Sequence, residues 1–503
     1  KLNIAATLGY EYNENYSKSY VMDIGGFPDI PGLEGPANGS EYLWADWNIS
    51  GNTRWTERSE SYFFRANLSY NRKYLLGFSI RRDGTSKLAK ENRYSNFPAV
   101  SAGWVISDEA FMSRQHVINL LKLRTSYGMT GSITNVSMAD CYDRLSSDIY
   151  WGKPALSVAS TLGNPDLQWE KTNQVDVGVD LALFQNRLTL IAEWYLKRTS
   201  GMMNSEPLPS STGGYTSRKI NAGTIRNSGV DLALNFQHHF TKDWGLTAGI
   251  NMNINRSKVI DLPVDNWAYS SAYYGGGNTP RPRLKIGQSF GALEMYRALG
   301  LDERGDIIYD DVSGNGSIDA ADKVIIDNLT PKFTGGLNLG VSWKNLSLFG
   351  QFSFTYGGKI YNLDEQLLRS TELGYDDVMK NKPDYILDRW TQENQSSRYP
   401  RFVVGAHGAQ NETGWNDRPS TLYLFDASFL KLNKLTLSYN LPQNWIQKLG
   451  MTSCSVYLSG ENLFTLKNKK LNVPDPEAAL TSGIAQKGVP SPRSFMIGLD
   501  LTF

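Results

Sequence analysis

Three kinds of feature are scarce in this sequence, and each absence excludes a class of protein. Only two cysteines occur, Cys141 and Cys454, and they lie far apart and outside any metal-binding spacing, so a disulfide between them is allowed but unsupported. No run of about 18 apolar residues is present, which excludes a transmembrane helix. The net charge is only +1, from 51 basic and 50 acidic residues. This balance gives no electrostatic reason to expect a nucleic-acid partner.

Signatures of catalysis are missing as well. The four histidines are His116, His238, His239 and His407, and none belongs to an HExxH motif or a Cys/His cluster. The sequence has no GxSxG nucleophile elbow and no P-loop. We therefore expect a protein that is not an enzyme. The remaining alternative is a hydrolase built into a barrel, because its catalytic residues would be scattered along the sequence.

Glycine and aromatic residues are abundant instead. The chain of 503 residues contains 46 Gly, 27 Tyr and 13 Trp, while apolar residues make up only 40%. We find no linker that would divide it into domains. This composition is typical of a β-rich protein whose strands are apolar on one face only.

Strict alternation of apolar and polar residues recurs along the chain. Residues 175–183 (VDVGVDLAL) and 246–255 (LTAGINMNIN) each carry apolar side chains at every second position, which predicts β-strands with one apolar face. The polar face of the second strand includes three Asn, which suits a water-filled lumen. The last residues form one more such strand, and we expect it to close a barrel. Its apolar face would meet lipid and comprises Phe495, Ile497, Leu499, Leu501 and Phe503.

The connections between these strands differ systematically in length. Short turns are expected at 71–73, 185–186, 241–243 and 344–345, and long loops at about 15–57, 130–168, 258–330, 359–424 and 466–491. Short turns at one end and long loops at the other are typical of an outer-membrane barrel, with the short turns periplasmic and the long loops extracellular. We therefore predict an all-β, transmembrane antiparallel β-barrel of about fourteen strands, with a bulge near Asn433. A soluble β-sandwich or solenoid is the alternative, because its strands alternate too.

The first residues already alternate like the middle of a strand. We therefore expect that Lys1 is not the biological N-terminus, and that a larger N-terminal part was cleaved, lies on a separate chain or is absent from this sequence.

Several long stretches resemble one family, the SusC-like TonB-dependent outer-membrane transporters of Bacteroidetes (SusC/RagA). They occur in the family's order and include RRDGTSKLAKENRYSNFPAVSAGWVISDEAFM (81–112), LGNPDLQWEKTNQVDVGVDLALF (162–184), DVSGNGSIDAADKVII (311–326), YLSGENLFTL (457–466) and RSFMIGLDLTF (493–503). The resemblance implies that residues 1–503 are the C-terminal part of a 22-stranded barrel. The N-terminal plug and the first strands would not be in this sequence.

The resemblance also implies a mechanism and partners. A SusD-like surface lipoprotein would act as a lid over the extracellular loops, and TonB, ExbB and ExbD would energise import of oligosaccharides or peptides through the N-terminal part. A passive outer-membrane channel or surface glycan-binding barrel, which would need no plug, is the rival hypothesis. A soluble glycan-binding β protein is a third.

The stretch DVSGNGSIDAAD has the spacing of a calcium-binding loop. Oxygen-bearing side chains alternate along it, and Gly316 falls where such a loop turns sharply. Position 12 is Asp322 rather than the bidentate Glu of an EF-hand, which resembles dockerin-type loops. We predict a structural Ca²⁺, and the alternative is a metal-free turn. The expected ligands are Asp311, Ser313, Asn315, Ser317, Asp319 and Asp322.

One long loop concentrates aromatic residues that can stack on sugar rings or bind peptides. We predict it as a ligand contact; otherwise its rings pack the loop or touch the lid. The residues are Trp267, Tyr269, Tyr273 and Tyr274. Trp415 is a weaker candidate in another long loop. Asp176, Asp180, Glu193 and Lys197 are candidates to line the lumen, and the alternative that we favour is a simple solvated face.

Overall fold

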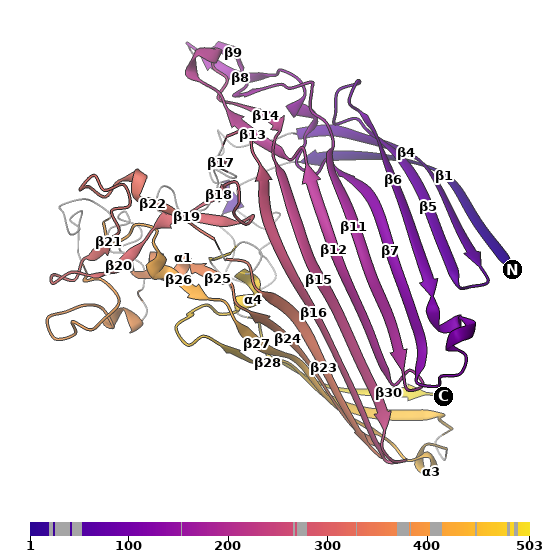
Figure 1. Ribbon diagram of the computed structural model, residues 1–503. Coiled ribbons are helices and arrows are strands. Elements are labelled where there is room, and N and C mark those ends of the chain that lie inside the picture. The colour runs from indigo at the N-terminus through magenta and orange to yellow at the C-terminus, as the bar shows by residue number, and fades with distance from the viewer. Residues whose placement is uncertain are drawn as a thin grey trace.

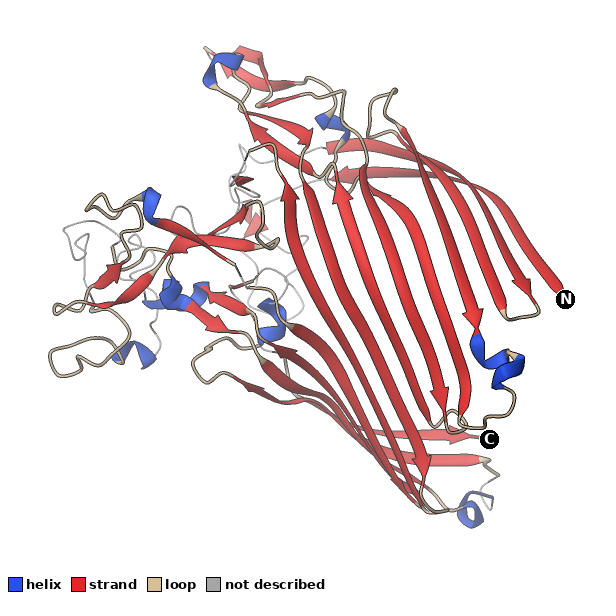
Figure 2. Cartoon of the chain, in the orientation of Figure 1, coloured by secondary structure: helices blue, strands red, loops and turns tan. Residues whose placement is uncertain are grey.

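A computed structural model shows one large curved sheet with folded loops at one end (Figure 1; Figure 2). It describes residues 1–19, 24–25, 41–42, 53–151, 153–264, 267–268, 279–327, 329–369, 382, 384–402, 415–447, 450–479, 483–486 and 491–503. The sheet has 14 strands, each antiparallel to the next, which confirms the predicted fold class. In order these are β1 (Leu2–Ser19), β4 (Thr53–Tyr70), β5 (Tyr74–Thr85), β6 (Tyr94–Val105), β7 (Ile118–Ser132), β11 (Glu170–Leu183), β12 (Leu188–Ser200), β15 (Thr224–His239), β16 (Trp244–Asp261), β23 (Phe333–Trp343), β24 (Leu346–Tyr356), β27 (Phe429–Asn440), β28 (Ser453–Lys467) and β30 (Ser494–Thr502).

The pairing register keeps the apolar positions of neighbouring strands on one face. Val177 pairs with Trp194, which pairs with Val230 on the following strand. The positions one residue away form the other face, where Glu193 pairs with Asp231. We call these the outer face and the inner wall. Val177 is 47% exposed and Ile497 is 78% exposed, so the apolar face of the sheet is also the face left bare, as lipid contact requires.

The predicted turns and the predicted bulge are confirmed. The register between β27 and β28 shifts between Leu432 and Lys434, which places the bulge at Asn433. Four tight turns lie where the alternation predicted them, and the long loops lie at the opposite end. The segments 86–93 and 201–223 are further connections at the long-loop end that the sequence pattern did not reveal.

The short-turn end carries an aromatic rim and two longer turns, one between β6 and β7 and one between β27 and β28. Trp244 stacks on Trp343 across β16 and β23, with ring centroids 5.9 Å apart. In the turn between β6 and β7, Glu109 lies between the two short helices η2 (Ile106–Asp108) and η3 (Ala110–Met112). Its carboxylate accepts hydrogen bonds from the Tyr74 hydroxyl (2.7 Å), the Trp104 indole (3.0 Å) and Lys73 Nζ (3.1 Å). One carboxylate therefore orients two rings of the rim.

The buried core of the molecule lies in its loops rather than in its wall. The described parts of segments 262–332, 357–428 and 468–493 fold together, and we call this unit the loop body (Figure 1). One cluster joins Leu293 and Met295 from the first segment, Tyr361 and Tyr423 from the second, and Ile484 from the third. The elements of the loop body are β17 (Trp267–Ala268), β18 (Arg281–Leu284), β19 (Ala292–Tyr296), β20 (Ala298–Leu301), β21 (Ile307–Tyr309), η7 (Ala320–Asp322), β22 (Lys323–Ile326), β25 (Lys359–Asn362), α1 (Leu363–Arg369), η8 (Asp384–Leu387), η9 (Thr421–Tyr423), β26 (Leu424–Asp426), α4 (Pro476–Ala479) and β29 (Ile484–Ala485).

A second group of small elements covers the long-loop end of β7, β11 and β12. It comprises η4 (Met138–Asp140), β8 (Leu145–Tyr150), β9 (Lys153–Val158), β10 (Thr161–Leu162), β13 (Met203–Pro207), η5 (Ser210–Thr212) and β14 (Ser217–Asn221). The remaining elements are β2 (Ile24–Gly25), β3 (Glu41–Tyr42) and, at the short-turn end, α3 (Gln443–Ile446). Among the helices of the described ranges, none has the length and apolar character needed to cross a membrane.

The sheet ends in two edge strands. β1 is hydrogen-bonded to β4 and β30 to β28, and within the described part of the chain β1 and β30 are not paired with each other. The outer-face residues predicted for the terminal strand are all exposed, namely Phe495, Ile497, Leu499, Leu501 and Phe503. That this strand closes a barrel therefore stays a prediction.

Candidate functional site

The inner wall is kept flat by glycines beside large side chains. Gly9 faces the Phe63 ring and Gly498 faces the Tyr457 ring so closely that a Cβ at either glycine would overlap the ring. At Gly178 the Cβ position lies 2.8 Å from the Arg124 guanidinium carbon. Each large side chain can therefore lie across its glycine along the wall instead of projecting from it.

A hollow of about 490 Å³ lies against this wall over β4–β7 and β11. It is lined by small residues, including Gly77, Ser101 and Gly103, and by charged residues, including Arg124 and Asp176. Small residues on adjacent strands give the wall a shallow concave surface that the alternation alone did not reveal.

The charged residues of the inner wall form paired networks. Arg124 on β7 binds Asp180 on β11 (Nε–Oδ1 3.1 Å) and Glu193 on β12 (NH1–Oε2 2.5 Å). Asp176 accepts a hydrogen bond from Ser126 Oγ at 2.9 Å, and it is 9% exposed. The structure thus places Asp176, Asp180 and Glu193 on the inner wall, each held by an ion pair or hydrogen bond, while Lys197 Nζ lies 5.0 Å from the centre of the Tyr195 ring.

Farther along the wall, β16 contributes amide side chains beside the remaining charges. Asn253 donates a hydrogen bond to Asp231 Oδ1 at 2.5 Å, and the Tyr195 hydroxyl donates to Asn255 Oδ1 at 3.1 Å. Asn251 Oδ1 accepts from the backbone N–H of Gly336 at 2.8 Å. This part of the wall therefore offers fixed hydrogen-bonding groups with little net charge.

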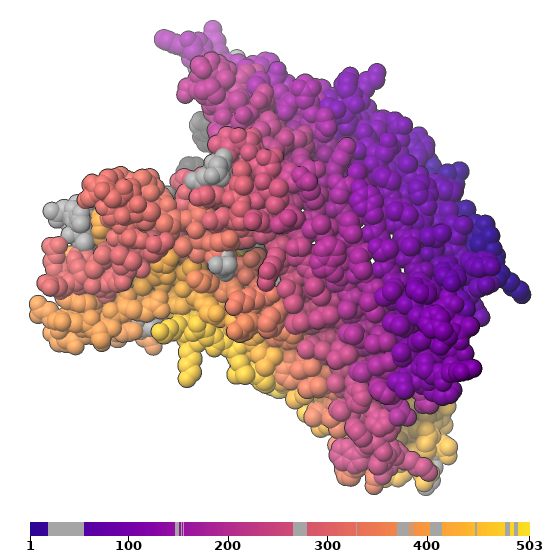
Figure 3. Space-filling model, viewed as in Figure 1, coloured from indigo at the N-terminus to yellow at the C-terminus, as the bar shows by residue number. Residues whose placement is uncertain are grey.

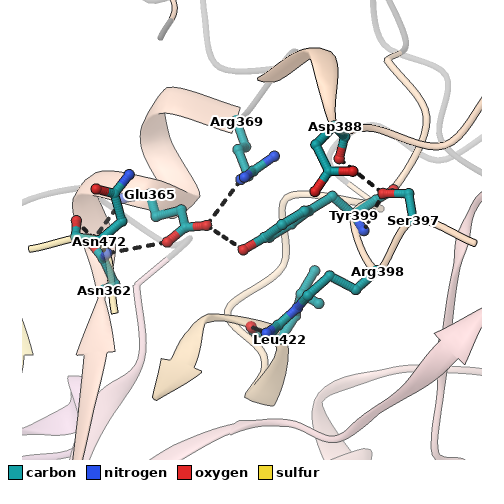
Figure 4. Close-up of polar contacts among 9 residues, drawn as sticks. All are labelled: Asn362, Glu365, Arg369, Asp388, Ser397, Arg398, Tyr399, Leu422 and Asn472. Atoms are coloured by element: carbon teal, nitrogen blue, oxygen red, sulfur yellow. Dashed lines mark hydrogen bonds and ion pairs between the residues drawn. The ribbon is translucent and has the colours of Figure 1, made fainter. Parts of the chain in front are cut away.

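Two buried carboxylates hold the loop body together. The first is Glu365 on α1, which is 2% exposed and which Figure 4 shows. It accepts hydrogen bonds from the Tyr399 hydroxyl (2.5 Å), Arg369 Nε (3.1 Å) and Asn362 Nδ2 (3.3 Å). Arg369 also stacks on the Tyr399 ring. Burial, and then the hydrogen bond to Glu365, raise the pKa of Tyr399 above its usual range, so the phenol stays protonated.

The second carboxylate is Asp306, which is fully buried. Arg401 binds it with two parallel hydrogen bonds of 2.7 and 2.8 Å, and Asn416 Nδ2 donates a third at 2.8 Å. The indole of Trp415 donates to the Ile307 carbonyl at 2.8 Å. These contacts join segment 262–332 to segment 357–428.

The six predicted calcium ligands lie in one turn that ends in η7. Asp311 accepts hydrogen bonds from the backbone N–H groups of Gly314 and Gly316, each at 2.8 Å. Asp322 accepts from the N–H groups of Asp319 and Ser313, which lower its pKa. Over the described ranges, no three His, Cys, Asp or Glu side chains are grouped so that they could hold a metal. The calcium site therefore stays a prediction, and its oxygen donors would include Ser, Asn and backbone groups.

The predicted aromatic contact mostly lies outside the described residues. Trp267 belongs to β17, while Tyr269, Tyr273 and Tyr274 fall in a segment that the structure does not describe. The suggestion for Trp415 is wrong, because its side chain is 3% exposed and packs with Tyr309 inside the loop body. Sequence reasoning also missed Glu365 and Asp306. The partners of Asp306 lie in another loop segment, and the partners of Glu365 form no recognisable sequence motif. Only the fold therefore reveals that these two carboxylates are buried and paired.

The fold and the wall define the class of this protein, and comparison with known families agrees. Residues 1–463 match the family described as TonB dependent receptor-like, beta-barrel. The chain belongs to this family of outer-membrane receptors and transporters.

Named relatives narrow the family to its SusC-like branch. The chain is 29% identical over 459 residues to TonB-dependent receptor SusC of Bacteroides thetaiotaomicron, which covers 88% of this chain and 43% of that protein. It is 28% identical over 474 residues to TonB-dependent receptor P3 of Formosa agariphila, covering 88% of this chain and 45% of the relative. The chain thus spans about half the length of these relatives.

A solved structure also supports the assignment to this family. The structure of the RagAB peptide transporter superposes with a TM-score of 0.78 at 26% identity, and it covers 100% of this chain and 54% of that one. The predictions of a SusC-like barrel and of an outer-membrane location are confirmed.

Proposed function

We propose that this chain is the C-terminal barrel portion of an active importer of nutrients across the outer membrane. The observation that carries the proposal is its likeness along its whole length to the barrel of the RagAB peptide transporter, together with its membership of the TonB-dependent receptor family. In the proposed mechanism a plug from the remaining half of the protein fills the lumen, and TonB with ExbB and ExbD rearranges it. In this mechanism passage is gated and involves no covalent chemistry.

The flat inner wall supports this proposal over a passive channel. Side chains that lie across glycines leave a smooth surface with a shallow hollow, against which a folded plug can pack closely. A passive pore would instead need side chains that project into the lumen to select its solutes.

The substrate is proposed to be an oligosaccharide or a peptide. The fixed amides of the wall can bind sugar hydroxyls and peptide groups alike. A peptide is favoured to the extent that a relative of the same fold is a peptide transporter. A SusD-like lipoprotein is proposed as the partner on the extracellular side, because the chain is similar to TonB-dependent receptor SusC and such a partner is what this resemblance implies.

Native mass spectrometry of the complex, extracted gently from its own outer membrane, tests the proposal. We expect a subunit about twice the length of this chain together with a lipoprotein partner. A subunit with the mass of this chain alone and no partner would overturn the plug-driven mechanism and favour a smaller passive barrel. Uptake that survives collapse of the proton-motive force would contradict active import.

We also propose that the turn at 311–322 binds one structural Ca²⁺. The proposal is supported by the spacing of its oxygen donors and by the backbone N–H groups that orient the Asp311 and Asp322 carboxylates within one turn.

A further inference from the structure

Four basic residues lie together on the outer face, at the long-loop ends of β12, β15 and β16, which Figure 1 labels. Arg198 pairs with Arg226, and Arg226 pairs with Lys258 on the next strand, so three cations form one row across the sheet. Arg256 precedes Lys258 by two residues and therefore lies on the same face. We call these four residues the basic patch, and all four are exposed. Because neighbouring strands are about 4.8 Å apart, the row is only roughly 10 Å wide.

The basic patch directly follows the apolar part of the outer face. One row across the same three strands consists of Trp194, Val230 and Ile254. The next row toward the long loops is mixed, because Ser228 pairs with Arg256 there. The row after that is the basic one. The outer face thus changes from apolar to basic over a few residues of each strand, at the same level on all three strands.

The distance from the short-turn end places the patch at the level of the extracellular headgroups. Arg226 is ten residues from Phe236, an outer-face residue near the short-turn end of β15. Ten residues of strand span roughly 33 Å, which is about 25 Å along the membrane normal at the tilt of about 40° typical of outer-membrane barrels. The apolar band of such a barrel is about 25 Å tall. The patch therefore lies where the hydrocarbon ends and the headgroups of the extracellular leaflet begin.

The protein does not neutralise the charges of the patch. Among the described residues, no acidic side chain forms an ion pair with any of the four, and this includes Asp261, which ends β16 just beyond the patch. Elsewhere on the outer face, in contrast, Arg58 on β4 binds Glu14 on β1 at 3.1 Å. Like charges directly opposite each other on neighbouring strands are destabilising. The row therefore costs folding free energy, and an anion from outside the protein would remove the repulsion.

We propose that the basic patch binds the phosphate of a phosphorylated lipid headgroup in the extracellular leaflet. Three of the four residues are arginines, whose guanidinium groups bind phosphate oxygens through two parallel hydrogen bonds. The apolar row below the patch contacts the acyl chains of the same lipid, so one lipid meets both surfaces. A free phosphate ion meets only the patch. A transported anion is a poorer fit, because the patch lies on the opposite face of the sheet from the inner wall.

Native mass spectrometry of the full-length protein in detergent, titrated with diphosphoryl lipid A as the phosphorylated lipid, tests the inference. The same lipid without its phosphates is the matched ligand, and inorganic phosphate is added separately as a competitor. Arg226→Gln removes the central charge of the row, and a double variant adds Lys258→Gln. The matched protein control is Arg58→Gln, because it removes an outer-face arginine that is 60% exposed but already paired with Glu14.

We expect Arg226→Gln to raise the Kd for the phosphorylated lipid about fivefold and the double variant to raise it about twentyfold, because each basic residue near an anionic lipid surface contributes about a factor of five. Arg58→Gln should change this Kd by less than about twofold. The lipid without phosphates should bind more weakly than the phosphorylated lipid, and equally to all variants.

Three results would overturn the inference. Equal affinity of the wild type and the double variant would show that the patch does not bind the lipid. Equal affinity of the wild type for the lipid with and without phosphate would show a contact with the acyl chains only. Full competition by inorganic phosphate at the concentration of the lipid would show a site for the free ion. The measurement does not involve uptake, so each of these results leaves the proposed import function intact.

Discussion

Buried charges in this molecule occur where several partners meet them. Glu365 has three donors and Asp306 has three hydrogen bonds from two residues. Lys431, whose side chain is 7% exposed, binds Asp475 at 2.7 Å and Glu477 at 3.0 Å. Removing a charge from water costs several kcal/mol unless partners compensate, so each such residue fixes the segments that supply its partners.

Glu109 gives a prediction with a defined pH range. Hydrogen bonds from Tyr74, Trp104 and Lys73 lower its pKa from 4.5 to about 2. Because the folded pKa lies below the unfolded one, its stabilising effect is complete above pH 4.5 and is lost as the pH falls toward 2. The wild type should therefore melt at a higher temperature than Glu109→Gln at pH 7, and the two melting temperatures should converge below pH 4.5. A difference that is constant across this range would show that the carboxylate charge is not responsible.

The calcium proposal is also tested at single residues. Isothermal titration of Ca²⁺ into the wild type should give a saturable signal for one site. Asp311→Asn removes a charged ligand at constant size and should weaken binding about tenfold or more, because hard cations depend on ligand charge. Asp310→Asn, next to the turn, is the control and should bind as the wild type does. A flat trace for the wild type would leave the turn metal-free.

At the scale of elements, the wall depends on which residues face each other across strands. Alternation assigns each residue to a face but not to a neighbour, and the neighbour decides whether a side chain lies flat. Gly9 and Phe63 on β1 and β4 show this directly, since they are paired in register.

Gly9→Ala should therefore destabilise the wall by about 1–3 kcal/mol, because the added methyl overlaps the Phe63 ring and displaces it. In Phe63→Ala the same glycine substitution should cost much less. Urea unfolding of the wild type, Gly9→Ala, Phe63→Ala and the double variant in the same bilayer measures the coupling between the two positions. Equal costs of Gly9→Ala in both backgrounds would mean that the ring can move away freely.

The contact between loop segments at Asp306 gives a second prediction at this scale. Asp306→Asn leaves the partly exposed Arg401 with a neutral partner and should destabilise the loop body by about 2 kcal/mol. Asp310→Asn breaks an ion pair with Arg297 at the surface, where the Arg297 side chain is 50% exposed and the Asp310 side chain 29% exposed. This substitution should destabilise the loop body by less than about 1 kcal/mol. Hydrogen exchange of residues 302–309 and 415–418 measures both effects. Similar protection in the two variants would contradict a special role for Asp306.

At the scale of the whole molecule, the sequence predicts the wall well and the loop body poorly. Strand number, turns and the bulge at Asn433 follow from a period of two, which is a local signal. The loop body is different, since Leu293 and Ile484 share one cluster although they are far apart in sequence. No local sequence pattern links such residues. The loop segments are interspersed between wall strands along the sequence, so a shared core among them cannot be recognised from any one stretch.

The shared core of the loop body also bears on how the barrels of this family diversify. Because segments 262–332, 357–428 and 468–493 bury one another's apolar residues, replacing any one of them by the matching loop of a relative would leave the other two with mismatched cavities. Figure 3 shows these segments packed together as one protrusion at the long-loop end of the sheet. New surface specificity is thus expected to be inherited as a set of three loops. A chimera that exchanges all three should fold where single-loop exchanges fail.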